Sequence, residues 1–171
     1  MIGCECADAM SRFTEALVVT PLADGNTWVI VRPFGYDVGR VGSGDRIDVP
    51  VGFMTDFLSI PRIFWIALPK WGRYGNAAVI HDWLYWTQSR SRASSDQILR
   101  EGMGVLAVPG WQRVAIYWAV RAFGWLAWAR NRWDREAGFD RVLARLPRKA
   151  TERSERPGLV RRTWTRLRLR S

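Results

Sequence analysis

Apolar and polar positions alternate in short runs over the first third of the chain, a pattern that is typical of strands. Residues 14–20 and 27–32 flank a turn signal at residues 23–26, which predicts an antiparallel hairpin. Residues 46–49 alternate in the same way and predict another short strand. Four glycines between residues 35 and 44 predict a loop. The front third is therefore expected to form a small sheet.

The rest of the chain shows the wider apolar spacing of helices. The expected helices span residues 62–68, 76–87, 94–107, 111–130 and, more weakly, 133–146. Asn76 is the expected cap of the second of these helices, and Ser94 and Gln97 have capping-box spacing at the start of the third. The segment 111–130 is apolar on nearly all sides, so we expect it to be mostly buried.

Strands that precede helices in this way are typical of an α+β protein. We expect a small N-terminal antiparallel β-sheet followed by a helical bundle. The chain of 171 residues, 48% of them hydrophobic, is long and apolar enough to bury one core and is not a disordered protein. A single globular domain is expected over residues 11–146. Residues 147–171 are expected to form a basic tail that is mobile or ordered by a partner.

The basic charge of the chain is concentrated at its C-terminal end. The net charge is +10, of which residues 141–171 carry +9 through 11 Arg/Lys and two acids. In this tail, basic residues interleave with apolar ones, and the expected binding residues are Arg161, Arg162, Trp164, Arg166, Arg168 and Arg170. This pattern suits nucleic acid, an anionic membrane surface or another protein of an assembly, and a solvated terminus is the alternative.

Neither export nor a membrane span is indicated. The start of the chain lacks a basic stretch followed by an apolar run, so no signal peptide is expected. The most apolar stretch, residues 111–128, is interrupted by Arg113 and Arg121 and does not predict a transmembrane helix. Cys4 and Cys6 are too close together to staple a fold.

Tryptophans are unusually frequent in the helical part. The set comprises Trp83, Trp86, Trp111, Trp118, Trp125 and Trp128. Such residues most often form a core or a protein interface. A lipid-facing surface is the alternative, and it requires that the 111–130 helix lie outside the bundle.

Candidate chemistry centres on His81, the single histidine of the chain, which lies beside Asp82 in an otherwise apolar helical segment. Asp82 projects about 100° away from His81 on a helix and therefore orients it poorly. If His81 is a general base, its orienting carboxylate comes from Asp96 or Asp56. An antiparallel return of the next helix would bring Asp96 close, and Asp82 would remain to bind a cation or a substrate. The alternative is a buried hydrogen-bonding node that only supports the fold.

A second polar cluster lies at residues 55–62. Asp56 either lines a site with His81 or is a turn residue, and Ser59 is favoured as a helix cap. A Ser59–His81–Asp96 nucleophile set lacks the strand-turn-helix setting that such a serine needs.

Two resemblances follow from these motifs. The run of residues 49–62, the segment 71–74 and the His-Asp-Trp-Leu-Tyr run at 81–85 resemble a domain family of unknown function, numbered 1353, over about residues 12–130. This resemblance implies a bacteriophage or prophage origin, and it does not supply an activity. His81, Asp82 and Tyr85 are also similar to the active helix of secreted phospholipases of the A2 class, Cys-Cys-x-x-His-Asp-x-Cys-Tyr.

The phospholipase likeness implies a histidine that activates water, an Asp that binds calcium and a further Asp, here Asp96, that orients the histidine. The sequence of this chain departs from the phospholipase pattern at Ala77, Ala78 and Leu84, which stand where that pattern has cysteines. No part of it matches the glycine-rich calcium loop.

Two functional hypotheses result. The first is a phage-encoded accessory or structural protein, in the virion or the host cytoplasm, with other phage proteins as partners and its basic tail as a docking arm. The second is a small metal-dependent, phospholipase-like hydrolase with His81 as base, Asp82 as ligand of a divalent cation such as calcium, and Asp96 or Asp56 as the orienting carboxylate.

Overall fold

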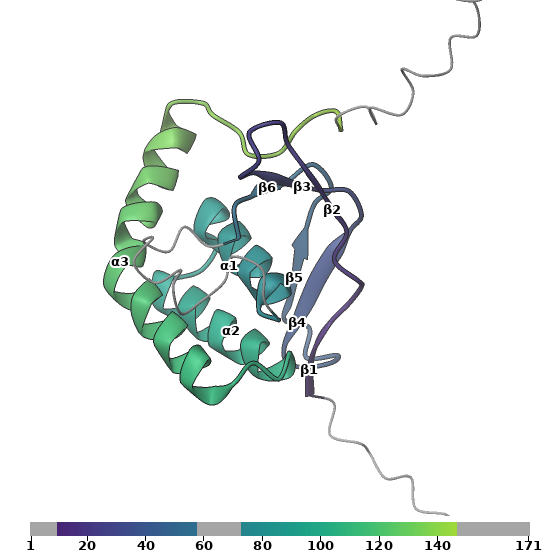
Figure 1. Ribbon diagram of the computed structural model, residues 1–171, viewed down its shortest axis with the longest axis vertical. Coiled ribbons are helices and arrows are strands. Elements are labelled where there is room, and N and C mark those ends of the chain that lie inside the picture. The colour runs from purple at the N-terminus through teal and green to yellow at the C-terminus, as the bar shows by residue number, and fades with distance from the viewer. Residues whose placement is uncertain (1–9, 58–72, 147–171) are drawn as a thin grey trace, which may run out of the picture.

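Two small antiparallel sheets form the N-terminal part of the computed structural model, which describes residues 10–57 and 73–146 (Figure 1). The strands are β1 (Met10–Phe13), β2 (Val19–Pro21), β3 (Trp28–Ile30), β4 (Phe34–Arg40), β5 (Arg46–Val49) and β6 (Met54–Thr55). Their orders are β1-β4-β5 and β2-β3-β6. The predicted hairpin is confirmed, because Val19 pairs with Ile30 and Pro21 with Trp28. Its first strand is shorter than predicted.

Strand β4 lies where the glycines predicted a loop, so that prediction was wrong. Phe34 pairs with Val49 on one side of β4, and Phe13 pairs with Tyr36 on the other. A Cβ atom at Gly35 would lie 2.8 Å from the backbone oxygen of Ile47. Glycine here permits a close approach of backbones and does not break the strand.

Three helices follow within the described residues, and the α+β class is therefore confirmed. They are α1 (Gly75–Thr87), α2 (Arg92–Val105) and α3 (Gly110–Glu136). The end of α1 matches the prediction, but the residue that precedes its first turn is Tyr74 and not Asn76. The expected helix at residues 62–68 and the tail from residue 147 lie outside the described residues.

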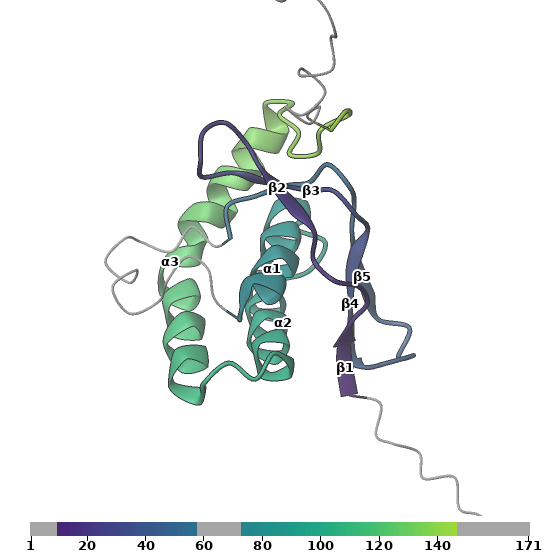
Figure 2. The same cartoon turned by 45° about the vertical axis from the view of Figure 1, so that its right-hand side comes forward.

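Helix α1 is the central element of the fold. It lies with α2 between the β1-β4-β5 sheet and α3, as Figure 2 shows. Nine of its thirteen residues are buried, which explains why its sequence is apolar on nearly every side. Polar groups on α1 are therefore placed in the interior, where they need partners.

Helix α3 corrects the prediction that residues 111–130 are mostly buried. It packs only one face, while Trp111, Trp118, Trp125 and Trp133 are 56–65% exposed, so the helix is not mostly buried. Apolar residues on all sides of a helix predict burial on all sides, but here the described residues leave the second apolar face of α3 uncovered. No helix of the described chain is both long and apolar enough to cross a bilayer.

The predicted helix at residues 133–146 does not form. Its first residues complete α3, and Gly138, with a φ of +83°, follows the end of that helix. The chain then returns to the sheet, where Val142 forms a bridge with Phe53. A Cβ atom at Gly52 would lie 2.5 Å from the backbone oxygen of Leu143, so this contact requires glycine.

Ser91 caps α2, three residues before the predicted capping box at Ser94 and Gln97. Its side chain accepts a hydrogen bond from the backbone N–H of Ser94 at 3.2 Å. We expect Ser91→Ala to lower the free energy of unfolding by about 1 kcal/mol, because the first turn of α2 loses its cap. Urea unfolding measures this change. Ser94→Ala is the matched control, and a larger loss in that variant would contradict the assignment.

Candidate functional site

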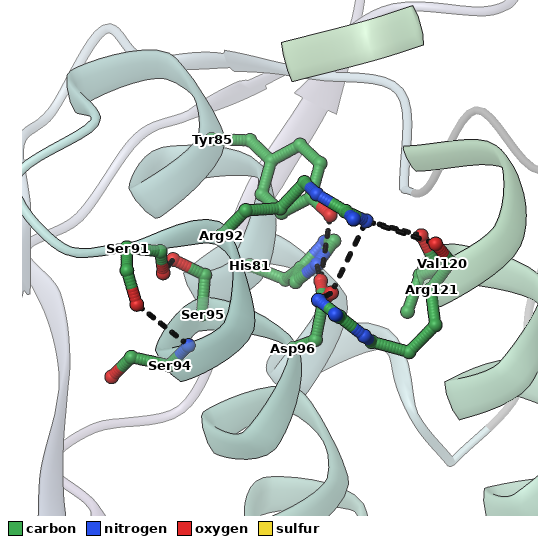
Figure 3. A network of polar contacts seen from close by, with 9 residues as sticks. All are labelled: His81, Tyr85, Ser91, Arg92, Ser94, Ser95, Asp96, Val120 and Arg121. Carbon is green, nitrogen blue, oxygen red and sulfur yellow. Dashed lines mark hydrogen bonds and ion pairs between the residues drawn. The ribbon is translucent and has the colours of Figure 1, made fainter. Parts of the chain in front are cut away.

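The imidazole of His81 lies inside the protein and contacts Asp96, one of the two carboxylates that were predicted to orient it. His81 Nε2 lies 2.9 Å from Asp96 Oδ1, and the two residues are 2% and 0% exposed (Figure 3). Helices α1 and α2 pack against each other, which places the first turns of α2 beside the middle of α1. The expectation that Asp96 comes close to His81 is therefore confirmed, whereas its catalytic role stays a prediction.

Asp96 also binds groups from two other positions. Its Oδ1 accepts a hydrogen bond from the Tyr85 hydroxyl at 2.6 Å, and its Oδ2 accepts one from Arg121 Nη1 at 2.8 Å. Arg92 Nη1 lies 3.7 Å from the same Oδ2 atom. The carboxylate thus joins all three helices, as Figure 3 shows.

These contacts determine the charges in the site. Burial acts to raise the pKa of Asp96, but hydrogen bonds from His81, Tyr85 and Arg121 outweigh it and bring the pKa below its usual value. Burial, together with the Asp96 charge, raises the pKa of Tyr85 well above its usual value. Asp96 is therefore ionised and Tyr85 is neutral at neutral pH.

His81 is the neutral member of the pair. Burial lowers the pKa of His81, and the Asp96 carboxylate opposes this shift without cancelling it. Because the neighbouring carboxylate is ionised, the neutral imidazole of His81 carries its proton on Nε2, and this N–H donates a hydrogen bond to Asp96. The other ring nitrogen, Nδ1, is buried and has no hydrogen-bond partner in the described structure. Its lone pair is thus available to accept a proton.

The lowered pKa of His81 makes stability depend on pH. The unfolded chain takes up a proton on histidine near pH 6.5, and the folded chain does so only at lower pH. We therefore expect the free energy of unfolding to fall as the pH decreases below about 6.5, by at most about 1.4 kcal/mol per pH unit. Urea unfolding between pH 7 and pH 5 measures this slope.

His81→Gln is the control for this prediction, because the chain has one histidine. The variant should lose most of the slope between pH 7 and pH 5, where the carboxylates with lowered pKa do not yet titrate. Equal slopes in the two proteins would contradict a buried neutral His81.

A cavity of about 460 Å³ lies beside this network. His81, Asp82 and Tyr85 of α1 line it together with apolar residues of α3, among them Phe123 and Leu126. The remaining polar lining residues are Thr27, Asp56, Arg130, Asn131 and Arg141. The cavity therefore joins the histidine to an apolar wall and to charged groups of both signs.

A glycine of α3 makes this arrangement compatible with close packing. A Cβ atom at Gly124 would lie 2.5 Å from the Tyr85 hydroxyl oxygen. The missing side chain leaves room for Tyr85 to reach Asp96 next to the cavity.

Asp82 and Asp56, the other predicted acids, lie at the cavity and not on the imidazole. Asp82 is 8% exposed, and its Oδ2 accepts a hydrogen bond from the Thr55 hydroxyl at 2.5 Å. Asp56 is half-buried after β6 and lines the same cavity. Of the two candidates for the orienting carboxylate, Asp96 and not Asp56 contacts His81.

A calcium ion prefers six to eight oxygen ligands. Among the described residues, no three His, Cys, Asp or Glu side chains come together as a metal site. Arg130 and Arg141 also line the cavity, and their charges oppose a cation there. The described residues by themselves thus do not fit calcium, and Asp82 as a cation ligand stays a prediction.

Sequence reasoning missed two parts of the site. Arg121 was read only as a polar break in an apolar helix, although an isolated charge in such a helix signals a buried partner. Arg130 and Arg141 gave no signal, because their proximity to His81 depends on how α3 and the following segment return across the fold. The Ser59 alternative and the tail residues Arg161 to Arg170 lie outside the described residues.

Comparison with known proteins places this site in a family. A protein of Sinorhizobium fredii (strain NBRC 101917 / NGR234), "Uncharacterized protein y4jT", is 40% identical over 84 residues. These residues make up 48% of this chain and 25% of that protein, so the match spans a quarter of the relative's length. No solved structure matches the chain at a comparable level of significance. The family described as "Protein of unknown function (DUF1353)" matches residues 28–120, more than half of the chain, and the chain belongs to this family.

Proposed function

We propose that this protein is a small hydrolase in which Nδ1 of His81 is the general base. The observation that carries the proposal is the unpartnered Nδ1 of a buried neutral histidine whose Nε2 is bound to Asp96, at a cavity large enough for a substrate. A base needs a free lone pair on one nitrogen and a fixed tautomer, and this pair supplies both.

The proposed reaction is the hydrolysis of an ester. Nδ1 takes a proton from water as the water oxygen bonds to the carbonyl carbon. The imidazolium that forms is stabilised by the ionised Asp96. It then gives the proton to the departing alcohol oxygen as the bond between that oxygen and the carbonyl carbon breaks. Asp96 orients the base and does not touch the substrate.

The lining of the cavity supports an amphiphilic ester as the substrate. The apolar wall of α3, with Phe123 and Leu126, suits an acyl chain, while Arg130 and Arg141 suit a negative charge on the substrate or on the transition state. The likeness to phospholipases enters here as support for testing phospholipids.

The test is a hydrolysis screen with nitrophenyl esters of short and long acyl chains and with phospholipid vesicles, each with and without calcium. Turnover by the wild type that is lost in folded His81→Gln would support the proposal, and dependence on calcium that is lost in Asp82→Asn would make Asp82 a ligand. Turnover that is equal in wild type and His81→Gln, or no turnover with any of these substrates, would contradict the proposal.

A phage accessory or structural protein, in the virion or the host cytoplasm, is the second candidate. The contacts of Asp96 with His81, Tyr85 and Arg121 favour it, because they join three helices and would be useful without any reaction. In this case we expect the protein in purified virions at a fixed copy number, with other phage proteins as partners. Absence from virions would contradict a structural role in the virion, and absence of any co-purifying phage protein from infected cells would contradict the accessory role in the host cytoplasm.

A further inference from the structure

Helix α3 presents an apolar face to solvent on the side opposite to its packed face. At about 100° per residue, six large apolar residues fall within an arc of about 120°. They form what we call the tryptophan face: Trp111, Val114, Trp118, Trp125, Leu126 and Trp133. The buried Ile116 and Val120 lie on the other side of the helix. Charged residues fall within this arc only in the last turns of the helix, at Arg132 and Glu136.

The exposed area of this face is large. Its four tryptophans, each 56–65% exposed, present on the order of 600 Å² of mostly apolar surface. Exposed apolar patches of a few hundred Å² or more on a soluble protein usually mark an interaction site. The size of the tryptophan face therefore indicates that it binds a partner.

The charge around the tryptophan face favours an anionic partner. Over its whole length α3 contains five arginines and two acids, a net charge of +3. The two acids, Asp134 and Glu136, lie in its last turn, 3.7 Å from Arg130 and 4.0 Å from Arg132. The C-terminal tail, with a net charge of +9, and a second copy of the same helix would each bring positive charge against these arginines. Charge thus disfavours both as the occupant of the face.

We propose that the tryptophan face docks on an anionic phospholipid bilayer. Tryptophan prefers the boundary between the headgroups and the acyl chains, and the exposed arginines near the face, Arg130 and Arg132, can reach lipid phosphates. Trp111 and Trp133 lie about 33 Å apart along the helix axis, so that the helix would lie flat on the surface. The exposed helix of Figures 1 and 2 has the position that such docking needs, at the outer side of the fold.

The face adjoins the cavity that contains His81. Leu126 belongs to the tryptophan face and also lines the cavity. Phe123, which is 44% exposed, lies next to this face and lines the cavity too. Docking would place the apolar wall of the cavity next to the lipid. This link rests on the proposed function, whereas docking itself does not.

The test is cosedimentation of the full chain with vesicles of phosphatidylcholine alone or mixed with phosphatidylglycerol. We expect binding to the mixed vesicles and an affinity lower by about tenfold or more in the double variant Trp118→Ser/Trp125→Ser. Both side chains are exposed, so the variant should fold, and circular dichroism checks this. Val41→Ser, an exposed apolar residue outside α3, is the matched control and should bind like the wild type.

The double variant keeps the basic tail, so equal binding of wild type and double variant would assign the binding to the tail and overturn the proposal. Absence of vesicle binding would also overturn the proposal. This holds even if the face then binds single-stranded nucleic acid or pairs with a second copy of the chain. His81→Gln should bind vesicles like the wild type, so a failure of hydrolysis is distinguishable from a failure of docking.

Discussion

Asp96→Ala is expected to lower the free energy of unfolding by about 3 kcal/mol. The substitution removes a carboxylate that is 0% exposed and accepts hydrogen bonds from His81, Tyr85 and Arg121. Truncation of one member of a buried charge network costs about 3–5 kcal/mol, because its partners stay buried without a counter-charge. Arg121 is 29% exposed in its side chain and regains some water, so the lower end of this range applies.

Chemical denaturation at neutral pH measures this loss, and two variants serve as controls. Asp134→Ala removes a carboxylate that lies 3.7 Å from Arg130 near the surface, and it should change stability by about 0.5 kcal/mol or less. Asp96→Asn keeps the shape and loses the charge, and an intermediate loss is expected. A loss below about 1 kcal/mol in Asp96→Ala would show that the network does little for the fold.

His81→Gln is expected to reduce turnover of an ester substrate by about 10²–10⁴-fold, the usual contribution of a general base. Glutamine can donate a hydrogen bond to Asp96 as the imidazole does, but it cannot take up a proton at neutral pH. The variant therefore separates the chemistry of His81 from its place in the packing. Initial rates on the substrate found in the screen measure the change.

The dependence of turnover on pH strengthens this test. The base acts only when it is unprotonated, and burial lowers the pKa of His81, so turnover should persist below pH 6.5 and fall only at lower pH. Asp96→Asn should also lower turnover, because an amide that donates to Nε2 would place the proton on Nδ1. Full turnover in folded His81→Gln would leave the network with a structural role alone.

The sequence predicted the general plan of the fold because local patterns carry that information. Strands before helices gave the α+β class, and the hairpin of β2 and β3 formed where a turn signal separated two alternating runs. Strand β4 was not predicted, because glycine occurs both in loops and where two backbones approach closely. Only the neighbouring strand at Ile47 shows that Gly35 serves the second purpose. The end of α3 escaped for a related reason, since the return of residues 141–143 to the sheet depends on contacts distant in the chain.

For the site, the sequence by itself determined that His81 is the single histidine, the side chain whose ordinary pKa lies near neutrality, and that Asp82 on the same helix does not face it. Tyr85 follows His81 by four residues, a spacing that puts two side chains on the same face of a helix. These conclusions need only the periodicity of one helix.

Only the tertiary structure decided which carboxylate meets His81, because Asp96 and Asp56 were both admissible until α2 packed against α1. It also decided that Arg121 completes the network and that four tryptophans of α3, Trp111, Trp118, Trp125 and Trp133, lie outside the core. A helix that is apolar all round carries no local information on which of its faces will be covered. That choice depends on the other elements of the fold, and here they cover one face of α3.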